Sequence, residues 1–336
     1  MEIREVAAPS QVTGRDVLLS VGAVGICGSD IHYFKKGRIG PAAVEFPFIL
    51  GHECAGTIVA TAPEAKRFKP GDRVAVDPLV SCGKCDQCRE RRTHTCRNQR
   101  FLGMPGQLSG ALVEFLVMPE ESCHAIPDSL TLGQAVMVEP LSIGLYAVRM
   151  ARIAPGATMA ILGTGPIGLS TLLASRAVVD CAPYVSDLLP ERLRLAKRLG
   201  AVWSGSPRSA DIVKEIRDSE PLGVDVVFEC AGEQETLDQG IELLKPGGTL
   251  LIVGIPEMDR ISFPIHTLRR KELTIRNVRR QNECMDDAIA LVASGRVDVS
   301  PLMTHNFDMA DSQAAFELVA GYRDGVVKAL IHASRE

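Results

Sequence analysis

The sequence predicts an α/β protein of two domains, one mostly β and one built around a doubly wound parallel sheet. Its 336 residues are enough for two domains of ordinary size. The first third is rich in Gly and Pro and contains short β-like runs, whereas the chain from residue 158 alternates short apolar runs with helical periods. That alternation is typical of a parallel sheet covered by helices on both faces.

The first domain is expected to be irregular β structure with long loops. Pro70 and Gly71 mark a turn before an apolar run, which predicts that a strand follows them. Strands are indicated within 17–26, 56–60 and 70–76. The last fifty residues predict helices at 285–295 and 309–321 and a strand at 328–333. We expect this final strand to return to the first domain.

The second domain is expected to alternate strands and helices. Strands are predicted at 158–162, 183–187, 225–230 and 249–254. Helices are predicted at 166–179, 190–200 and 234–244. Gly200 suits the end of the second of these helices, because glycine tolerates the left-handed conformation of a C-terminal cap.

Composition excludes several function classes. The net charge of −4 and the pI near 6.0 do not favour binding to nucleic acid or to an anionic membrane. No apolar run reaches the roughly 18 residues that span a bilayer. The polar N-terminus, MEIREVAAPSQV, resembles neither a signal peptide nor a transit peptide, so we expect a cytoplasmic protein.

A glycine-rich motif predicts a dinucleotide site. Gly163, Gly165 and Gly168, with Pro166 and Ile167 between the last two, form G-x-G-x-x-G directly after an apolar strand and at the start of a helix. Glycine permits a tight turn and close approach of the backbone to a pyrophosphate, and the N-terminus of the helix supplies free N–H groups.

An acidic residue at the end of the next strand predicts which dinucleotide binds. Asp187 follows Gly168 by 19 positions, where a carboxylate accepts hydrogen bonds from the adenosine ribose and repels a 2′-phosphate. The nearby Arg192 favours tolerance of that phosphate. We predict NAD rather than NADP.

Four cysteines predict a structural zinc site. Cys82, Cys85, Cys88 and Cys96 lie within fifteen positions, and four thiolates close every position of a tetrahedral ion. Arginines flank the cysteines of this lobe, residues 82–96, so contact with nucleic acid is an alternative interpretation. The absence of a recognition-helix pattern and of interleaved aromatic residues disfavours it.

A second group of residues predicts a catalytic metal. Cys27 offers a thiolate, His52 an imidazole, and Glu53 and Glu139 offer carboxylates. Three protein ligands with one open position are typical of catalytic zinc. The prediction depends on the co-occurrence of these residues, because a lone cysteine or histidine more often belongs to the core.

The chain resembles the zinc-containing medium-chain alcohol dehydrogenases, and within them the sorbitol/xylitol (polyol) dehydrogenase branch. The motifs occur in the family's order: GICGSDIHYF, GHE, PGDRVAV, the four cysteines, VEPLS, GTGPIG, the strand ending at Asp187, and KPGG. The resemblance covers essentially the whole chain. It implies a GroES-like catalytic domain from residues 1–140 and 286–336, an inserted Rossmann domain from residues 141–285, and assembly as a homodimer or homotetramer.

The resemblance also implies roles for individual residues. Zinc would be held by Cys27, His52 and a glutamate, which in the polyol branch matches Glu53, while the position of Glu139 holds or exchanges with the zinc-bound water. Which glutamate binds the metal directly stays open. Other implied positions are Ser29 and His32 in a proton relay, Tyr33 in the polyol pocket, Val253, Gly254 and Ile255 near the nicotinamide, and Arg279, Arg280 and Gln281 beside the substrate and the cofactor phosphates.

The sequence therefore predicts an enzyme that moves a hydride from a secondary alcohol, a polyol, to NAD and forms a ketose. Zinc would act as a Lewis acid on the substrate oxygen, and the cofactor would accept the hydride. Gln281 stands where many polyol dehydrogenases carry an aromatic residue. Alternatives are dehydrogenases of L-threonine, sugar acids or phosphorylated polyols, and, in another class, a non-catalytic zinc protein that binds a partner or nucleic acid.

Overall fold

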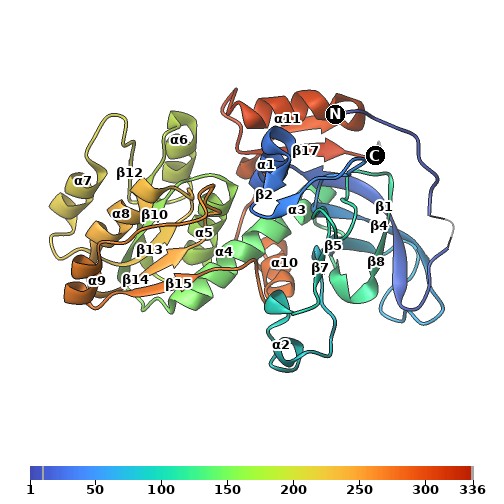
Figure 1. Ribbon diagram of the computed structural model, residues 1–336, viewed down its shortest axis with the longest axis horizontal. Helices are drawn as coiled ribbons and strands as arrows, with labels where there is room; N and C mark the ends of the chain where they lie inside the picture. Colours follow the sequence, from blue (N-terminus) through green and yellow to red (C-terminus); the bar gives the residue numbers. More distant parts are fainter. Residues whose placement is uncertain (10, 334–336) are drawn as a thin grey trace. The chain divides into compact units, whose positions relative to one another are not determined.

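The computed structural model describes residues 1–9 and 11–333 and divides into two compact units (Figure 1). The first unit comprises Met1–Glu139 and Met285–Glu336, and the second comprises Pro140–Cys284. No helix in the described part of the chain is both long and apolar enough to cross a membrane.

The first unit is built on a seven-stranded sheet with strand β1 (Asp16–Gly25) near its centre. The sheet has the order β16–β17–β1–β4–β5–β9, and β8 also pairs with β1. The bounds of these strands are β4 (Glu53–Thr61), β5 (Arg73–Val76), β8 (Phe115–Pro119), β9 (Cys123–Ala125), β16 (Met303–Asp308) and β17 (Lys328–His332). Strand β17 pairs with β1, which confirms the expected return of the C-terminal strand to the first domain.

The register of this sheet gathers three distant segments at one end of β1. Gly25 lies opposite Glu53 of β4 and opposite Leu330 of β17. A Cβ atom on Gly25 would lie 2.4 Å from the Oε2 atom of Glu53 and 2.9 Å from Val136. Only glycine leaves room here for the Glu53 side chain, so the sequence of β1 itself makes space for the site.

Helices and a small lobe complete the first unit. The helices are α1 (Gly28–Lys36), α3 (Leu132–Val136), α10 (Met285–Ala293) and α11 (Ser312–Ala320), with short 3₁₀ turns η2 (Glu120–Ser122), η3 (Ser300–Leu302) and η4 (Met309–Asp311). The lobe contains α2 (Asp86–Arg89) and η1 (Thr93–Thr95), and the paired strands β6 (Leu79–Val80) and β7 (Arg100–Phe101) lie on either side of it in the chain. Strands β2 (Arg38–Ile39) and β3 (Ala42–Ala43) form a hairpin. Apolar side chains of β1, β4, β5 and β8 form the core beneath the sheet.

The second unit is a six-stranded parallel sheet in the order β12–β11–β10–β13–β14–β15. Its strands are β10 (Ala157–Leu162), β11 (Cys181–Ser186), β12 (Trp203–Gly205), β13 (Val224–Glu229), β14 (Leu244–Ile252) and β15 (Thr274–Asn277). In chain order this is 3-2-1-4-5-6, the doubly wound Rossmann arrangement, which confirms the predicted class. The strand order reverses between β10 and β13, so their carboxyl ends are where such sheets bind ligands.

The helices of the second unit begin where their sequences supply start signals. Helix α5 starts at Pro166, a residue whose fixed φ suits the first helical position, and Asp211 caps α7 by accepting a hydrogen bond from the Lys214 N–H at 3.0 Å. The helices are α4 (Val138–Ala151), whose first two residues belong to the first unit, α5 (Pro166–Val178), α6 (Pro190–Arg198), α7 (Ile212–Ser219), α8 (Gln234–Leu243) and α9 (Ile265–Lys271). Their apolar faces pack on the strands, with Ile216, Leu237 and Ile241 fully buried.

Candidate functional site

Three side chains that can bind a metal converge in the first unit. Cys27 immediately precedes α1, His52 precedes β4, and Glu53 opens it. The Cys27 Sγ, a ring nitrogen of His52 and a carboxylate oxygen of Glu53 lie within 4.8 Å of one another. Zinc binds sulfur, nitrogen and oxygen at about 2.0–2.3 Å, so its ligand atoms lie no more than about 4.5 Å apart. The donor set and its spacing fit one zinc ion with an open position for substrate.

Asp30 organises two of these residues and was missed by the sequence analysis. Its side chain is fully buried and accepts hydrogen bonds from the Cys27 N–H at 3.0 Å and the Gly51 N–H at 3.2 Å. It also lies 3.4 Å from Nδ1 of His52. Asp30 is the third residue of α1, where a carboxylate reaches back to the N–H before the helix. This position was the signal that the sequence offered.

Opposite charges dominate the titration of this pair. Burial by itself raises the pKa of Asp30, but His52 and the hydrogen bonds to Asp30 outweigh burial and lower that pKa. Burial lowers the pKa of His52, but Asp30 and Cys27 raise it well above its usual value. Both shifts have the same physical origin, the close approach of the buried Asp30 carboxylate to the buried His52 ring.

Lys328 brings a positive charge to the same place and was also missed. It is fully buried at the start of β17. Its Nζ donates to the Ile26 carbonyl at 3.0 Å and to the Oε2 atom of Glu53. The Oε1 atom of Glu53 is buried and has no hydrogen bond within the described residues. Glu53 therefore offers one buried oxygen to a metal.

Glu139 lies outside the group of three ligands. It is buried in the first turn of α4, and the pKa of its carboxyl is raised to about 8, because of burial and because of the negative charge of Glu53. The two carboxyl groups thus interact electrostatically. The geometry favours Glu53 over Glu139 as the residue that binds zinc directly.

The other residues predicted near the metal lie on one short helix. Ser29, His32 and Tyr33 are half-buried residues of α1. The Tyr33 ring meets Phe48 edge-on, with ring centroids 5.9 Å apart. Helix α1 ends at Gly37, whose φ of 66° suits a left-handed cap. The helix begins directly after the ligand Cys27, and these three side chains lie within its first two turns.

The four cysteines of the lobe form a second group that fits zinc. Their ligand atoms lie within 4.8 Å of one another, and Sγ–Sγ distances are 3.6 Å for Cys85–Cys88, 3.9 Å for Cys85–Cys96 and 4.0 Å for Cys82–Cys88. Sulfurs placed tetrahedrally about 2.3 Å from one zinc ion lie about 3.8 Å apart. N–H groups of Lys84 and Cys85 donate to Cys82 and lower its thiol pKa to about 6. The geometry fits a closed, structural site.

The glycine motif forms the turn between β10 and α5. Gly165 caps α5, and no side chain caps the N–H groups of the first turn. A Cβ atom on Gly168 would lie 1.9 Å from the Gly163 carbonyl oxygen, so only glycine allows the helix to pack this closely against the turn. The uncapped N–H groups at the carboxyl edge of the sheet fit a pyrophosphate.

Asp187 follows β11 and is held beside this turn. Its Oδ2 accepts hydrogen bonds from the backbone N–H and hydroxyl of Thr164 at 2.7 and 3.0 Å, and its Oδ1 accepts from the Leu189 N–H at 2.9 Å. The guanidinium of Arg192 lies 4.0 Å from Oδ2. Each carboxylate oxygen has two lone pairs, so Oδ1 retains capacity for a ribose hydroxyl.

A buried glutamate joins two loops at the same edge and was not predicted. The Oε1 atom of Glu229 accepts from the N–H groups of Ala231 and Gly232 at 2.8 and 2.7 Å. Its backbone carbonyl accepts from those of Val253 and Gly254 at 2.8 and 2.9 Å. Burial raises the pKa of Glu229. The predicted nicotinamide positions 253 and 254 are thereby fixed by the end of β13.

The remaining predicted positions differ in exposure. Ile255 is exposed, Arg279 is exposed and Arg280 is half-buried. Arg280 has a φ of 55°, which is uncommon for a residue with a side chain. Gln281 is buried, and its Oε1 accepts from the Cys284 N–H at 2.9 Å. The Gln281 side chain therefore also stabilises the turn before α10.

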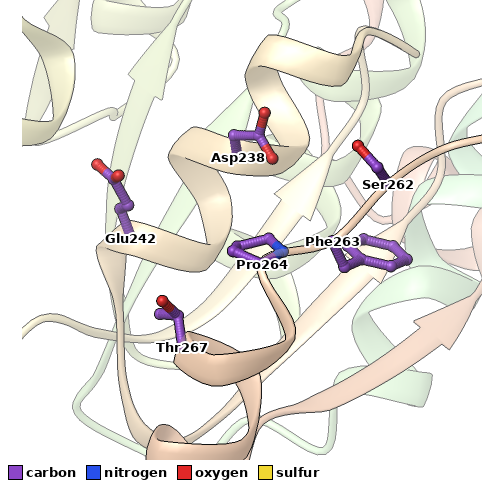
Figure 2. A pocket seen from close by; sticks show the side chains of 6 residues that line it. All are labelled: Asp238, Glu242, Ser262, Phe263, Pro264 and Thr267. Carbon is purple, nitrogen blue, oxygen red and sulfur yellow. The ribbon is translucent and has the colours of Figure 1, made fainter.

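A cavity of about 470 Å³ lies elsewhere in the second unit, between α8 and the start of α9 (Figure 2). Its lining consists of Asp238, Glu242, Ser262, Phe263, Pro264 and Thr267. None of these is a predicted site residue, and the acidic side chains of α8 do not suit a phosphate-bearing cofactor. We do not assign the dinucleotide to this cavity.

Comparison with known proteins decides the family. Residues 13–128 match the family model of the alcohol dehydrogenase GroES-like domain, and residues 166–294 match that of the zinc-binding dehydrogenases. A sorbitol dehydrogenase of Bacillus subtilis is 39% identical over 95% of this chain and 91% of its own length. The chain belongs to the zinc-binding alcohol dehydrogenase family. This confirms the predicted oxidoreductase class and its polyol branch.

Other relatives describe the range of this family. An L-idonate 5-dehydrogenase of Vitis vinifera is 36% identical over 91% of this chain and 85% of its own length. A zinc-binding dehydrogenase of Sinorhizobium meliloti, solved with NADP bound, superimposes with a TM-score of 0.90 at 31% identity and covers 98% of this chain and 95% of its own. Zinc and a nicotinamide dinucleotide are the cofactors expected for the family, in agreement with the sequence prediction.

Proposed function

We propose that this protein oxidises a secondary hydroxyl of a polyol to a ketone and transfers the hydride to NAD. The observation that carries the proposal is the convergence of Cys27, His52 and Glu53 in a buried group with the donor types and spacing of a catalytic zinc site. The likeness to sorbitol dehydrogenase supports the polyol as substrate class.

The two units have separate tasks in this proposal. The unit formed by Met1–Glu139 and Met285–Glu336 is the catalytic domain, and the unit Pro140–Cys284 binds NAD. Cys27, His52 and Glu53 would hold the catalytic zinc, and the four cysteines of the lobe would hold the structural one. When bound, the catalytic zinc supplies a Lewis acid that lowers the proton affinity of the substrate hydroxyl.

The chain's own residues orient the ligands and move the proton. Asp30 faces Nδ1 of His52 and so leaves Nε2 to face the metal, as an outer carboxylate does in many zinc sites. Ser29 and His32, on the first two turns of α1, would carry the substrate proton outward. Glu139 would hold water beside Glu53, with which it interacts electrostatically. Tyr33 would donate a hydrogen bond to a further hydroxyl of the polyol.

Asp187 favours NAD as the oxidant. Thr164 and Leu189 hold the carboxylate in place, where it would accept from the ribose hydroxyls and repel a 2′-phosphate. Val253, Gly254 and Ile255 are proposed nicotinamide contacts. Arg279, Arg280 and Gln281 are proposed contacts of the phosphates and the substrate.

The proposed setting is a homodimer or homotetramer in the cytoplasm. The resemblance to the polyol dehydrogenase branch is what suggests the assembly. We propose no nucleic-acid partner, because the net charge of the chain is −4.

The test is a substrate panel followed by NADH absorbance. Purified protein with zinc and NAD is expected to reduce NAD with sorbitol, xylitol or a related polyol. The panel includes L-idonate, because of the sugar-acid relative, and also L-threonine and a phosphorylated polyol. Reduction with one of these alone would keep the chemistry and reject the polyol. A protein that neither binds NAD nor reduces it would reject the dehydrogenase altogether.

A further inference from the structure

Strand β17 carries a charged side chain, Lys328, at a buried position where apolar residues are usual. The first four residues of β17, from Lys328 to Ile331, are all buried, and the three after Lys328 are apolar. Moving an ammonium group out of water costs several kcal/mol. A buried ion pair seldom stabilises a folded protein more than well-packed apolar residues of similar volume would. The stability of the fold alone therefore does not account for this lysine.

Lys328 connects the two segments that carry the predicted zinc ligands. Its Nζ donates to the carbonyl of Ile26, which precedes Cys27, and to the Oε2 atom of Glu53. Strand pairing fixes the lysine itself, because the Ile26 N–H donates to the Ala329 carbonyl at 3.0 Å. A single side chain from the C-terminal strand thus contacts two segments that carry zinc ligands, 302 and 275 positions earlier in the chain.

The two oxygens of Glu53 have different surroundings. Lys328 occupies Oε2, whereas Oε1 is buried without a hydrogen-bond partner in the described part of the chain. A buried carboxylate oxygen is costly without a partner, and a metal ion among the three converging ligands would supply one. The carboxylate cannot turn without breaking its contact with the lysine.

We propose that Lys328 is a positioning residue of the catalytic zinc site. It holds Oε2 of Glu53 and presents Oε1 as the single oxygen ligand of the metal. This inference rests on the proposed function, in which Glu53 binds zinc. Residues that orient a ligand from outside typically change metal affinity by about 10–100-fold when they are replaced.

The opposite effect is expected if the lysine acts only as a nearby charge. A cation close to Zn²⁺ repels it, so its removal would then tighten zinc binding. A purely structural lysine would change the stability of the protein and leave zinc release unchanged. The change in the rate of zinc release on replacing Lys328 therefore separates the three roles: faster release for a positioning residue, slower release for a nearby charge, and no change for a purely structural residue.

The test measures zinc per chain while a chelator removes it. The wild type is expected to hold two zinc ions per chain, one in each ligand group. Lys328→Met is expected to release one of them at least about tenfold faster and to keep the zinc of the four cysteines, which reports that the chain is folded. In the cobalt-substituted protein the variant should also change the visible absorption of the catalytic ion.

Lys271→Met is the matched control. Lys271 donates to three backbone carbonyls at the end of α8, in the other unit. Its loss should lower thermal stability and leave zinc release unchanged. Lys328→Arg, which keeps the charge and the donors, should restore slow release at least in part.

The outcomes are distinguishable. Release from Lys328→Met at or below the wild-type rate would overturn the inference. If this variant does not fold, Lys328→Gln, whose amide ends one atom short of the lysine nitrogen, should show the same acceleration, and unchanged release would again overturn it. A wild type that binds only the zinc of the lobe would instead reject the proposed function.

Discussion

At the residue scale, Glu120 is a buried carboxylate that binds three donors. The Arg15 guanidinium donates to its Oε1 at 2.8 Å, and the N–H groups of Lys66 and Arg67 donate to its Oε2 at 2.8 and 2.7 Å. Burial raises the pKa of Glu120, but these hydrogen bonds and the charge of Arg15 outweigh burial and lower it. Because one donor is directed at Oε1 and two at Oε2, both oxygens must act as acceptors, as they do in an ionised glutamate.

We predict that Glu120→Gln destabilises the protein in a pH-dependent way. The amide NH2 of the glutamine would face N–H donors that now bind a carboxylate oxygen, which should lower the free energy of unfolding by about 2 kcal/mol at pH 7. Because the folded-state pKa is lowered, the stabilisation by Glu120 is present above the usual value of about 4.3 and is lost as the pH falls through the folded-state pKa. Denaturant unfolding between pH 7 and pH 3 should show the two proteins converging. A difference that stays constant with pH would contradict the prediction.

We predict that Asp187→Ser shifts cofactor preference toward NADP. The variant removes the negative charge that repels a 2′-phosphate and leaves Arg192, now 4.0 Å from that carboxylate, to attract it. The ratio of kcat/KM for NAD to that for NADP should fall by about 100-fold or more, which corresponds to about 2.7 kcal/mol. Steady-state kinetics with both cofactors measures it, and an unchanged ratio would remove Asp187 from the site.

The sequence reveals a site residue only when the pattern that marks it lies within a short stretch of chain. Cys27, His52 and Glu53 are found by motif, as are the glycines of the turn. Asp30 offered a local signal that was not used. Lys328 could not be found, because its partner Glu53 lies 275 positions away and neither segment's sequence indicates the strand register that brings them together.

At the scale of elements, we predict that Gly168→Ala disrupts the turn between β10 and α5. The new methyl group would lie 1.9 Å from the Gly163 carbonyl, so the helix must move away. The dissociation constant for NAD should rise at least tenfold, and stability should fall by about 1–3 kcal/mol. NADH fluorescence titration and thermal unfolding measure both effects. Gly28→Ala, at a position that has open space and, like Gly168, no positive φ, controls for the added methyl group.

We predict that Cys96→Ser removes the structural zinc and unfolds the lobe. Its loops have few regular elements, and metal binding to four thiolates contributes directly to folding. One zinc per chain should be lost, and protease cleavage within 82–100 should increase. Retention of both zinc ions and of protease resistance would contradict a structural role for this site.

Elements with a strong period were predicted, and elements without one were not. The expected strands at 17–26, 158–162 and 328–333 are confirmed to within a residue or so at either end, as β1, β10 and β17. Helix α4 was missed because it is buried almost all round, which hides a helical period. Helix α7 was missed despite the Asp211 cap, and the edge strand β15 is only four residues long.

At the scale of the whole molecule, the first unit takes its residues from both ends of the chain. Strand β17 pairs with β1 and supplies Lys328 to the segment around Glu53. Composition could exclude classes of function, and the alternation of apolar runs with helical periods could predict the α/β class. Neither could show that the last strand completes a site that begins at Cys27. That information lies in strand pairing, which a single sequence does not reveal.

The most direct test of the central claim compares Cys27→Ser with the wild type. A hydroxyl is a much weaker zinc ligand than a thiolate. We predict that the variant keeps one zinc per chain, binds NADH normally, and forms NADH from a polyol at least about 1,000-fold more slowly, a loss of about 4 kcal/mol in transition-state stabilisation. A variant that retains both zinc ions and wild-type activity would show that Cys27, His52 and Glu53 are not the catalytic centre.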